Sequence, residues 1–118
     1  LRMDGGTEAI QQLIKSKRPI DAIFCANDTT ALSTIIYLKK VGIKVPHDIA
    51  VMGFSNEPFS EFVTPSISTV KQPGFLMGRK AAQLIIEQIH EKDTKTEFET
   101  IIMPTELIIR ESSLKRKS

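Results

Sequence analysis

Hydrophobic and polar positions between residues 21 and 58 predict a strand, a helix and a second strand. Asp21–Ala26 is a short and nearly continuous apolar run, as expected for a strand covered on both faces of a parallel sheet. From Thr29 the spacing becomes helical, and the apolar face comprises Ala31, Leu32, Ile35, Ile36 and Leu38. Ile49–Phe54 reads as a second buried strand. Together they predict a βαβ unit with a right-handed crossover.

Polar residues follow each of the two strands. Asn27 and Asp28 come after the first, and both are residue types that cap a helix N-terminus. Ser55 comes after the second strand. Because parallel strands finish at the same edge of a sheet, we expect Asn27, Asp28 and Ser55 to lie side by side. That edge is where open α/β sheets bind their ligands.

The flanking segments continue the pattern. Asp4–Gly6 predicts a turn, and Thr7 predicts the cap of a helix from Glu8 to about Lys17. Phe59 and Phe62 are three residues apart, so one turn of helix would place them together. Such a pair either covers the edge of the sheet or forms a subunit contact.

The C-terminal half predicts a strand over Ser68–Gln72 and a helix from about Phe75 to Glu91, with a polar turn at 92–96. Pro104 interrupts Glu99–Arg110, which we interpret as two short extended pieces. From Ser112 onward we expect a solvated tail that ends in Lys115, Arg116 and Lys117.

Composition sets broad limits. The 118 residues are 41% hydrophobic and 25% charged with a net charge of +2, which is ordinary for a globular domain and does not indicate nucleic acid or a membrane surface. Cys25 is the single cysteine, which excludes an intramolecular disulfide and fits a reducing, cytoplasmic compartment. No apolar run approaches the roughly 20 residues that span a bilayer. Because the chain starts at Leu1 rather than Met, the missing leader carries little weight.

An ordered set of motifs resembles the effector-binding domain of the lactose/galactose repressor family, and it covers nearly the whole chain. The matching segments are Ala22–Asp28 with Ala31 and Leu32, Gly42–Phe54, Thr64 and Pro65, Ser68–Val70 with Gln72 and Pro73, Gly78 with Ala81 and Ala82, and Pro104, Glu106, Leu107, Arg110, Glu111 and Ser112.

The resemblance implies an α/β fold: a parallel-sheet, Rossmann-like subdomain of the periplasmic-binding-protein type, present in truncated form. Residues 1–70 would be the second half of the C-terminal subdomain. Residues 71–98 would hold a crossover and a helix that packs on the N-terminal subdomain in relatives. Residues 99–112 would be the return crossing and 113–118 a tail. The helix would then lack its usual partner, so its apolar stripe would need refolding or self-association to become buried.

The resemblance also implies ligand-binding residues at the sheet edge. Asn27 would hydrogen-bond a small effector, although a helix cap without a ligand is the alternative. Asp28 is better suited to capping than to direct binding. Ser55 stands where many relatives have an aspartate, so its contact would be weaker or water-mediated. Phe54 would stack on a ring or fill the core, and Gln72 matches a crossover position that contacts inducer in some relatives.

An enzymatic reading needs a nucleophile, a base and an orienting group, or paired carboxylates or metal ligands. His47 and His90 have no reason to meet, and Cys25 is expected to be buried and unactivated. We therefore expect no catalytic residue, cofactor or metal.

The sequence predicts the effector-sensing and dimerisation part of a bacterial transcription regulator, with a sugar-like effector and Phe59 and Phe62 as candidate dimer contacts. DNA would be bound only by a domain absent from this chain, and no membrane is involved. The alternatives are a periplasmic sugar-binding protein of a transport system and, from another class, a small α/β enzyme.

Overall fold

The computed structural model describes residues 4–91 and 98–115, and the chain divides into two compact units. The first comprises residues 1–71 and 106–118, and the second comprises residues 72–105. Each unit is described by itself below.

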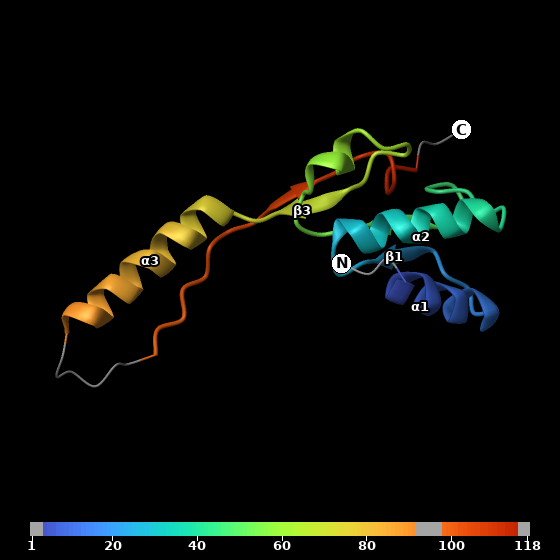
Figure 1. Ribbon diagram of the computed structural model, residues 1–118. Helices are drawn as coiled ribbons and strands as arrows, with labels where there is room; N and C mark the ends of the chain where they lie inside the picture. Colours follow the sequence, from blue (N-terminus) through green and yellow to red (C-terminus); the bar gives the residue numbers. More distant parts are fainter. Residues whose placement is uncertain (1–3, 92–97, 116–118) are drawn as a thin grey trace. The chain divides into compact units, whose positions relative to one another are not determined.

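The first unit contains the predicted βαβ arrangement (Figure 1). Its elements are α1 (Asp4–Lys15), β1 (Ala22–Phe24), α2 (Asp28–Lys40), β2 (Ala50–Met52), the 3₁₀ helix η1 (Pro58–Glu61), β3 (Thr69–Lys71) and β4 (Glu106–Ile108). The strands β1 and β2 pair in parallel, with Ile23 opposite Val51. The central prediction of a strand, a helix and a parallel strand is confirmed.

The strand β3 lies next to β2. Met52 and Ser68 form a parallel bridge, and the backbone N–H of Gly53 donates to the carbonyl of Ser68 at 2.8 Å. The strand β4 pairs with β3 in the antiparallel sense, with Leu107 opposite Val70. The expected strand near residue 70 is therefore present, and the chain returns beside it after residue 105.

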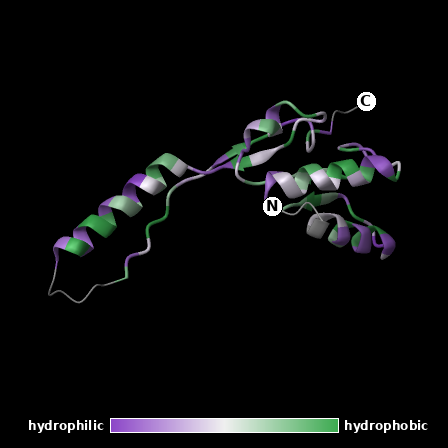
Figure 2. Ribbon diagram, viewed as in Figure 1, coloured by the Kyte–Doolittle hydropathy of each residue, from purple (hydrophilic) through white to green (hydrophobic). Residues whose placement is uncertain are grey.

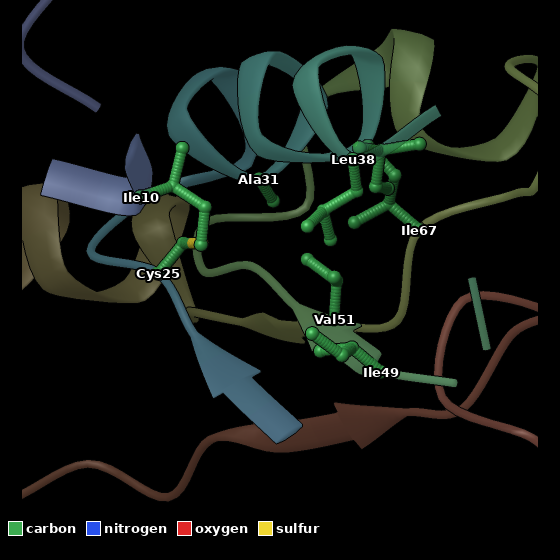
Figure 3. Packing of buried hydrophobic residues seen from close by; sticks show 8 residues of the cluster. Ile10, Cys25, Ala31, Leu38, Ile49, Val51 and Ile67 are labelled. Carbon is green, nitrogen blue, oxygen red and sulfur yellow. The ribbon is translucent and has the colours of Figure 1, made fainter. Parts of the chain in front are cut away.

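One face of this sheet carries the hydrophobic core (Figure 3). The core residues come from α1, α2, the strands and the loops: Ile10, Cys25, Ala31, Ile35, Leu38, Ile49, Val51 and Ile67. The helices α1 and α2 contact each other and share this cluster, so both cover the same face. On the other face Phe24 is 66% exposed. The expectation that β1 is covered on both faces is therefore wrong for the described part of this unit.

Helix α1 begins at Asp4, so the predicted turn at residues 4–6 and the cap at Thr7 are both wrong. A Cβ added at Gly6 would lie only 2.8 Å from the Cγ2 methyl of Thr30. Gly6 therefore lets α1 approach α2 closely, and the glycine pattern reflects helix packing rather than a turn.

Ser112 is fully buried, which corrects the expectation of a solvated tail from this residue onward. Its hydroxyl donates to the carbonyl of Val51 at 2.6 Å and accepts from the backbone N–H of Ser68 at 2.9 Å. Its own carbonyl accepts from the N–H of Val51 at 2.8 Å. The chain is thus held by β2 and β3 up to this point. Residues 116–118, with Arg116 and Lys117, lie outside the described residues.

The second unit contains the predicted helix, α3 (Gly74–His90), and the extended segment 98–105. No residue of α3 is buried. Figure 2 shows hydrophobic residues along its length, and the most exposed are Phe75, Leu76, Met77, Ile85, Ile86 and Ile89. The expected apolar stripe is therefore present and open to solvent. The predicted polar turn at 92–96 lies outside the described residues.

Candidate functional site

The carboxyl ends of β1 and β2 bring the polar residues of the two strand ends together, as the sequence predicts. The backbone N–H of Asp28 donates to the carbonyl of Phe54 at 3.1 Å. This bond joins the start of α2 to the loop after β2, so Asn27 and Ser55 stand on adjoining segments of one sheet edge.

Asn27 caps α2. Its Oδ1 accepts from the backbone N–H of Thr30 at 2.8 Å, and its extended backbone (φ −158°, ψ 170°) is typical of an N-cap residue. The capping alternative is therefore present in the structure. The amide nitrogen has no partner in the described part of the chain, so Asn27 retains two hydrogen-bond donors at the edge. Capping and ligand binding are compatible because they use different atoms.

Asp28 is fully buried, and both of its oxygens accept hydrogen bonds. Oδ2 accepts from the backbone N–H of Glu57 at 2.7 Å and from the hydroxyl of Ser60 at 2.6 Å. Oδ1 accepts from the hydroxyl of Thr69 at 2.6 Å. Burial at this level leaves no surface for a ligand, so the structure favours a structural role for Asp28 over direct binding.

Ser55 and Asn56 both have positive φ angles, 99° and 52°. Asparagine adopts this region more readily than other non-glycine residues, whereas for Ser55 it is costly, and strained residues gather at functional sites. Ser55 is exposed, and its N–H donates to the carbonyl of Val70 at 2.9 Å. Nη2 of Arg110 donates to Oδ1 of Asn56 at 3.0 Å, while Nη1 donates to the carbonyl of Ile67 at 2.9 Å. The loop is therefore held in a demanding conformation with the Ser55 side chain outward.

Sequence reasoning missed Asn56 and Arg110 as supports of this loop. The segment Ser55-Asn56-Glu57-Pro58 carries a turn signal, but nothing in the local pattern indicates that an arginine about 50 residues away would bind it. This contact depends on the return of the chain through β4.

Phe54 is half-buried and contacts Phe24 edge to face, with ring centroids 6.4 Å apart and planes at 81°. Such T-shaped pairs are a favoured arrangement of aromatic rings. Both rings lie on the sheet face that α1 and α2 leave uncovered. Phe54 is thus neither a core residue nor an isolated ring, and its ring-stacking role stays a prediction.

Three further candidates lie outside the two strand ends. Gln72 is exposed and belongs to the second unit. Phe59 packs against the core, whereas Phe62 is 80% exposed. The backbone N–H of Phe62 donates to the carbonyl of Phe59 at 3.0 Å, so the expected helical turn joins them, and the role of the pair stays a prediction. Phe62 alone remains as an exposed candidate for a subunit contact.

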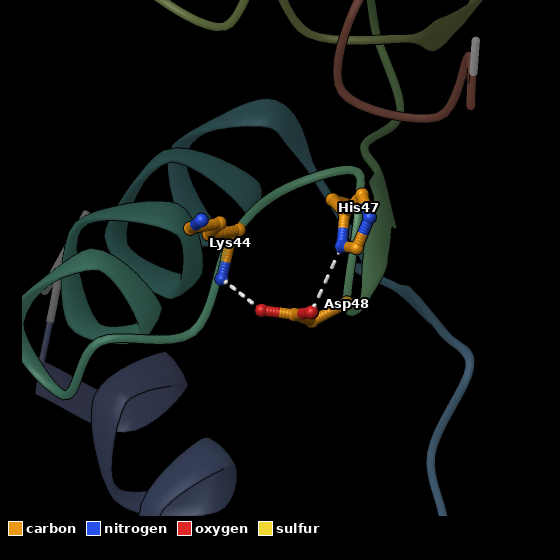
Figure 4. Close-up of polar contacts among 3 residues, drawn as sticks. All are labelled: Lys44, His47 and Asp48. Atoms are coloured by element: carbon orange, nitrogen blue, oxygen red, sulfur yellow. Dashed lines mark hydrogen bonds and ion pairs between the residues drawn. The ribbon is translucent and has the colours of Figure 1, made fainter. Parts of the chain in front are cut away.

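The turn Lys44–Asp48 is held by hydrogen bonds between its own residues (Figure 4). Oδ2 of Asp48 accepts from the backbone N–H of Lys44 at 2.8 Å, and Oδ1 lies 3.0 Å from Nδ1 of His47. The Lys44 amide, and secondarily His47, lower the pKa of Asp48 below its ordinary value of 3.8. His47 therefore supports a surface turn.

Cys25 is buried, and its sulfur lies 3.7 Å from Oγ1 of Thr34. Burial raises the pKa of the thiol, and the Thr34 hydrogen bond opposes this in part. A thiol in this state is a poor nucleophile. Across residues 4–91 and 98–115, no group of three or more His, Cys, Asp or Glu side chains is placed to hold a metal ion. In the same ranges, no helix is long and apolar enough to cross a membrane.

Comparison with known proteins identifies the domain. The family described as periplasmic binding protein-like domain matches residues 2–113. The probable HTH-type transcriptional repressor ExuR of Bacillus subtilis is 36% identical over 110 residues, which are 93% of this chain and 32% of that protein. The lactose operon repressor of Rhizobium radiobacter is 37% identical over 111 residues, which are 94% of this chain and 95% of that sequence.

Among solved structures, the complex of the transcriptional regulator CelR with cellobiose superimposes with a TM-score of 0.85. It is 33% identical, and the match covers 95% of this chain and 34% of that one. The chain spans about a third of the length of relatives such as the Bacillus repressor. The resemblance seen in the sequence and the expected fold class are both confirmed.

Proposed function

Because the chain belongs to the periplasmic binding protein-like domain family, and relatives that match nearly all of it are transcriptional repressors, we propose that it senses an effector within a bacterial transcription regulator. The observation that carries this proposal is the sheet edge. It presents the unused amide donors of Asn27 beside the exposed Ser55, on a loop held at positive φ.

The effector we propose is a sugar or sugar derivative. The two free amide donors of Asn27 suit the oxygen of a sugar hydroxyl, and the Phe24–Phe54 pair offers an aromatic surface nearby. The CelR structure contains cellobiose, which supports the same ligand class for this chain. The neutral Ser55 hydroxyl would contact the sugar more weakly than a carboxylate, or through water.

The proposed mechanism is allosteric. A ligand that binds one conformation better than another shifts the population toward it by its differential affinity. In this protein the shift would reach DNA through a homodimer, with Phe62 as an exposed contact, and through a DNA-binding domain outside this chain. We place its action in the cytoplasm.

The alternatives receive less support. A periplasmic sugar-binding protein would share the architecture, but the relatives reported above are named as repressors. A small α/β enzyme would need a reactive group, whereas Cys25 is buried with a raised pKa and His47 is engaged in a surface turn.

Isothermal titration calorimetry on the gene product that carries this chain tests the proposal. The ligands are cellobiose, lactose, galactose, glucose and ribose, and injections of buffer without sugar serve as the blank. We expect at least one sugar to bind with a dissociation constant in the micromolar to millimolar range, about −8 to −4 kcal/mol. Absence of heat with all of them, and with their phosphates and acids, would contradict the proposed effector class.

A further inference from the structure

The carboxylate of Asp28 is a junction of three segments. Its own residue starts α2, Ser60 belongs to η1 and Thr69 belongs to β3. The hydroxyls of Ser60 and Thr69 and the N–H of Glu57 donate to this carboxylate at 2.6–2.7 Å. The described residues provide no cation beside it, so this buried charge depends on these three donors together with the N-terminal end of the α2 dipole.

The same junction fixes the loop that presents Ser55. Three consecutive backbone amides each have an acceptor. Ser55 donates to the carbonyl of Val70 at 2.9 Å, Asn56 donates to Oγ1 of Thr69 at 3.1 Å, and Glu57 donates to Oδ2 of Asp28 at 2.7 Å. The Thr69 hydroxyl is used twice, because it also donates to Asp28. Hydrogen bonds to Val70, Thr69 and Asp28 therefore hold Ser55 and Asn56 at their positive φ angles.

Oδ2 of Asp28 connects this loop with η1, because it accepts from both Glu57 and Ser60. Ser60 is fully buried, and its carbonyl accepts from the N–H of Ile67 at 2.7 Å. The N–H of Phe62 donates to the carbonyl of Phe59, so the exposed Phe62 follows directly from η1. If the Glu57 amide is displaced, Oδ2 of Asp28 loses one of its two donors, and its hydrogen bond to Ser60 of η1 is affected.

We propose that Asp28 is a positioning residue that couples the Ser55 loop to η1 and so to the exposed Phe62. This proposal rests on the proposed function in one respect only, namely that the ligand which displaces the loop is the effector. The ligand does not contact Asp28. It acts on the loop at Ser55, and the shared Oδ2 atom transmits the change to η1.

Amide hydrogen exchange on the gene product tests the coupling without any ligand. In Asp28→Asn the side chain keeps its size, but an amide NH₂ replaces one acceptor oxygen and faces a donor. We expect at least tenfold faster exchange at Asn56, Glu57 and Phe62, and less than twofold change at core amides such as Val51. Ser60→Ala removes only the η1 bond, so it should accelerate Phe62 at least fivefold and leave Asn56 within twofold.

Unchanged exchange at Phe62 in both variants would overturn the coupling. Equal acceleration at Phe62 and Val51 would also overturn it, because the carboxylate would then stabilise the fold as a whole. If Asp28→Asn does not fold, the Ser60→Ala result decides alone.

A second experiment uses a sugar that binds the unmodified protein. It measures separately the affinity for this sugar and the change in operator affinity that the sugar causes. Thr69→Val, which loosens the loop, should weaken sugar affinity at least fivefold. Ser60→Ala should retain affinity within threefold but reduce the sugar-induced change in operator affinity at least fivefold. Parallel losses in both variants would contradict the assignment. A protein that binds no sugar would overturn the proposed function, while the exchange experiment would still decide the coupling.

Discussion

Gly53 and Asp28 are in direct contact, because the space that a Cβ would occupy on Gly53 is filled by Oδ1 of Asp28. Such a Cβ would also stand 3.0 Å from the Cα of Asp28. The glycine at the end of β2 thus lets α2 begin against the sheet, with its buried carboxylate in place. Gly53 is needed for this close approach rather than for an unusual backbone angle.

Gly53→Ala should lower the free energy of unfolding by about 2–3 kcal/mol, because overpacking of a tight contact costs that much. Urea denaturation followed by circular dichroism measures the change. Gly74→Ala is the matched control, since nothing lies within 4 Å of a Cβ at Gly74. A loss of under about 0.5 kcal/mol at Gly53 would show that Asp28 moves aside easily.

The Cys25 thiol should react slowly with a thiol reagent in the folded chain, because it is buried and its pKa is raised. Reaction with 5,5′-dithiobis(2-nitrobenzoic acid) at pH 8 should be at least 100-fold slower than in 6 M guanidinium chloride, which serves as the control. A native rate close to the denatured rate would contradict the packing of β1 against α1 and α2.

Asp48 should titrate below its ordinary value of 3.8, because the charged carboxylate accepts from the Lys44 amide and lies beside His47. A depressed folded-state pKa means that the charged form stabilises the turn above the unfolded pKa. This contribution disappears as the pH falls through the lower, folded value. Carboxyl carbon shifts in NMR should show the low pKa, and His47→Ala should raise it in part. A pKa at or above 3.8 would contradict the observed turn.

Phe62 should contribute to self-association of the gene product. We expect Phe62→Ser to raise the dimer dissociation constant at least tenfold, about 1.4 kcal/mol, since exposed aromatic residues often dominate interfaces. Sedimentation velocity measures this, with Glu61→Ser as the neighbouring polar control. Equal dissociation in both variants, or no change in either, would remove Phe62 from the interface.

Local patterns predicted much of the fold. The apolar run ending at Cys25, the helical spacing after Thr29 and the second run to Phe54 lie in one continuous stretch, so they predicted the βαβ unit and the juxtaposition of Asn27 with Ser55. The helix after Pro73 followed from the same periodicity. These features depend on residues that are close in sequence, so the spacing of hydrophobic and polar positions is sufficient to predict them.

Features that depend on distant residues were not predicted. The local sequence at Gly6 predicts a turn, because its contact, Thr30, lies in another helix and leaves no local signal. The sequence predicts a solvated tail from Ser112 onward, whereas Ser112 is buried and hydrogen-bonded to Val51 and Ser68. The support of Asn56 by Arg110 and the three donors on Asp28 likewise join segments that the sequence keeps apart. Polar residues carry no periodic signal that would identify such partners.

The most direct test of the account is sugar-dependent operator binding by the gene product and its Asn27→Asp variant. Asn27→Asp keeps the oxygen that caps α2 but removes the amide donors, whereas Asn27→Ala removes both. In a mobility-shift titration with DNA from upstream of the gene, a sugar that binds should change operator affinity. Asn27→Asp should require about 5- to 150-fold more sugar, since one buried hydrogen bond contributes about 1–3 kcal/mol. An unchanged sugar requirement would return Asn27 to capping alone, and operator binding that no sugar alters would contradict the effector function.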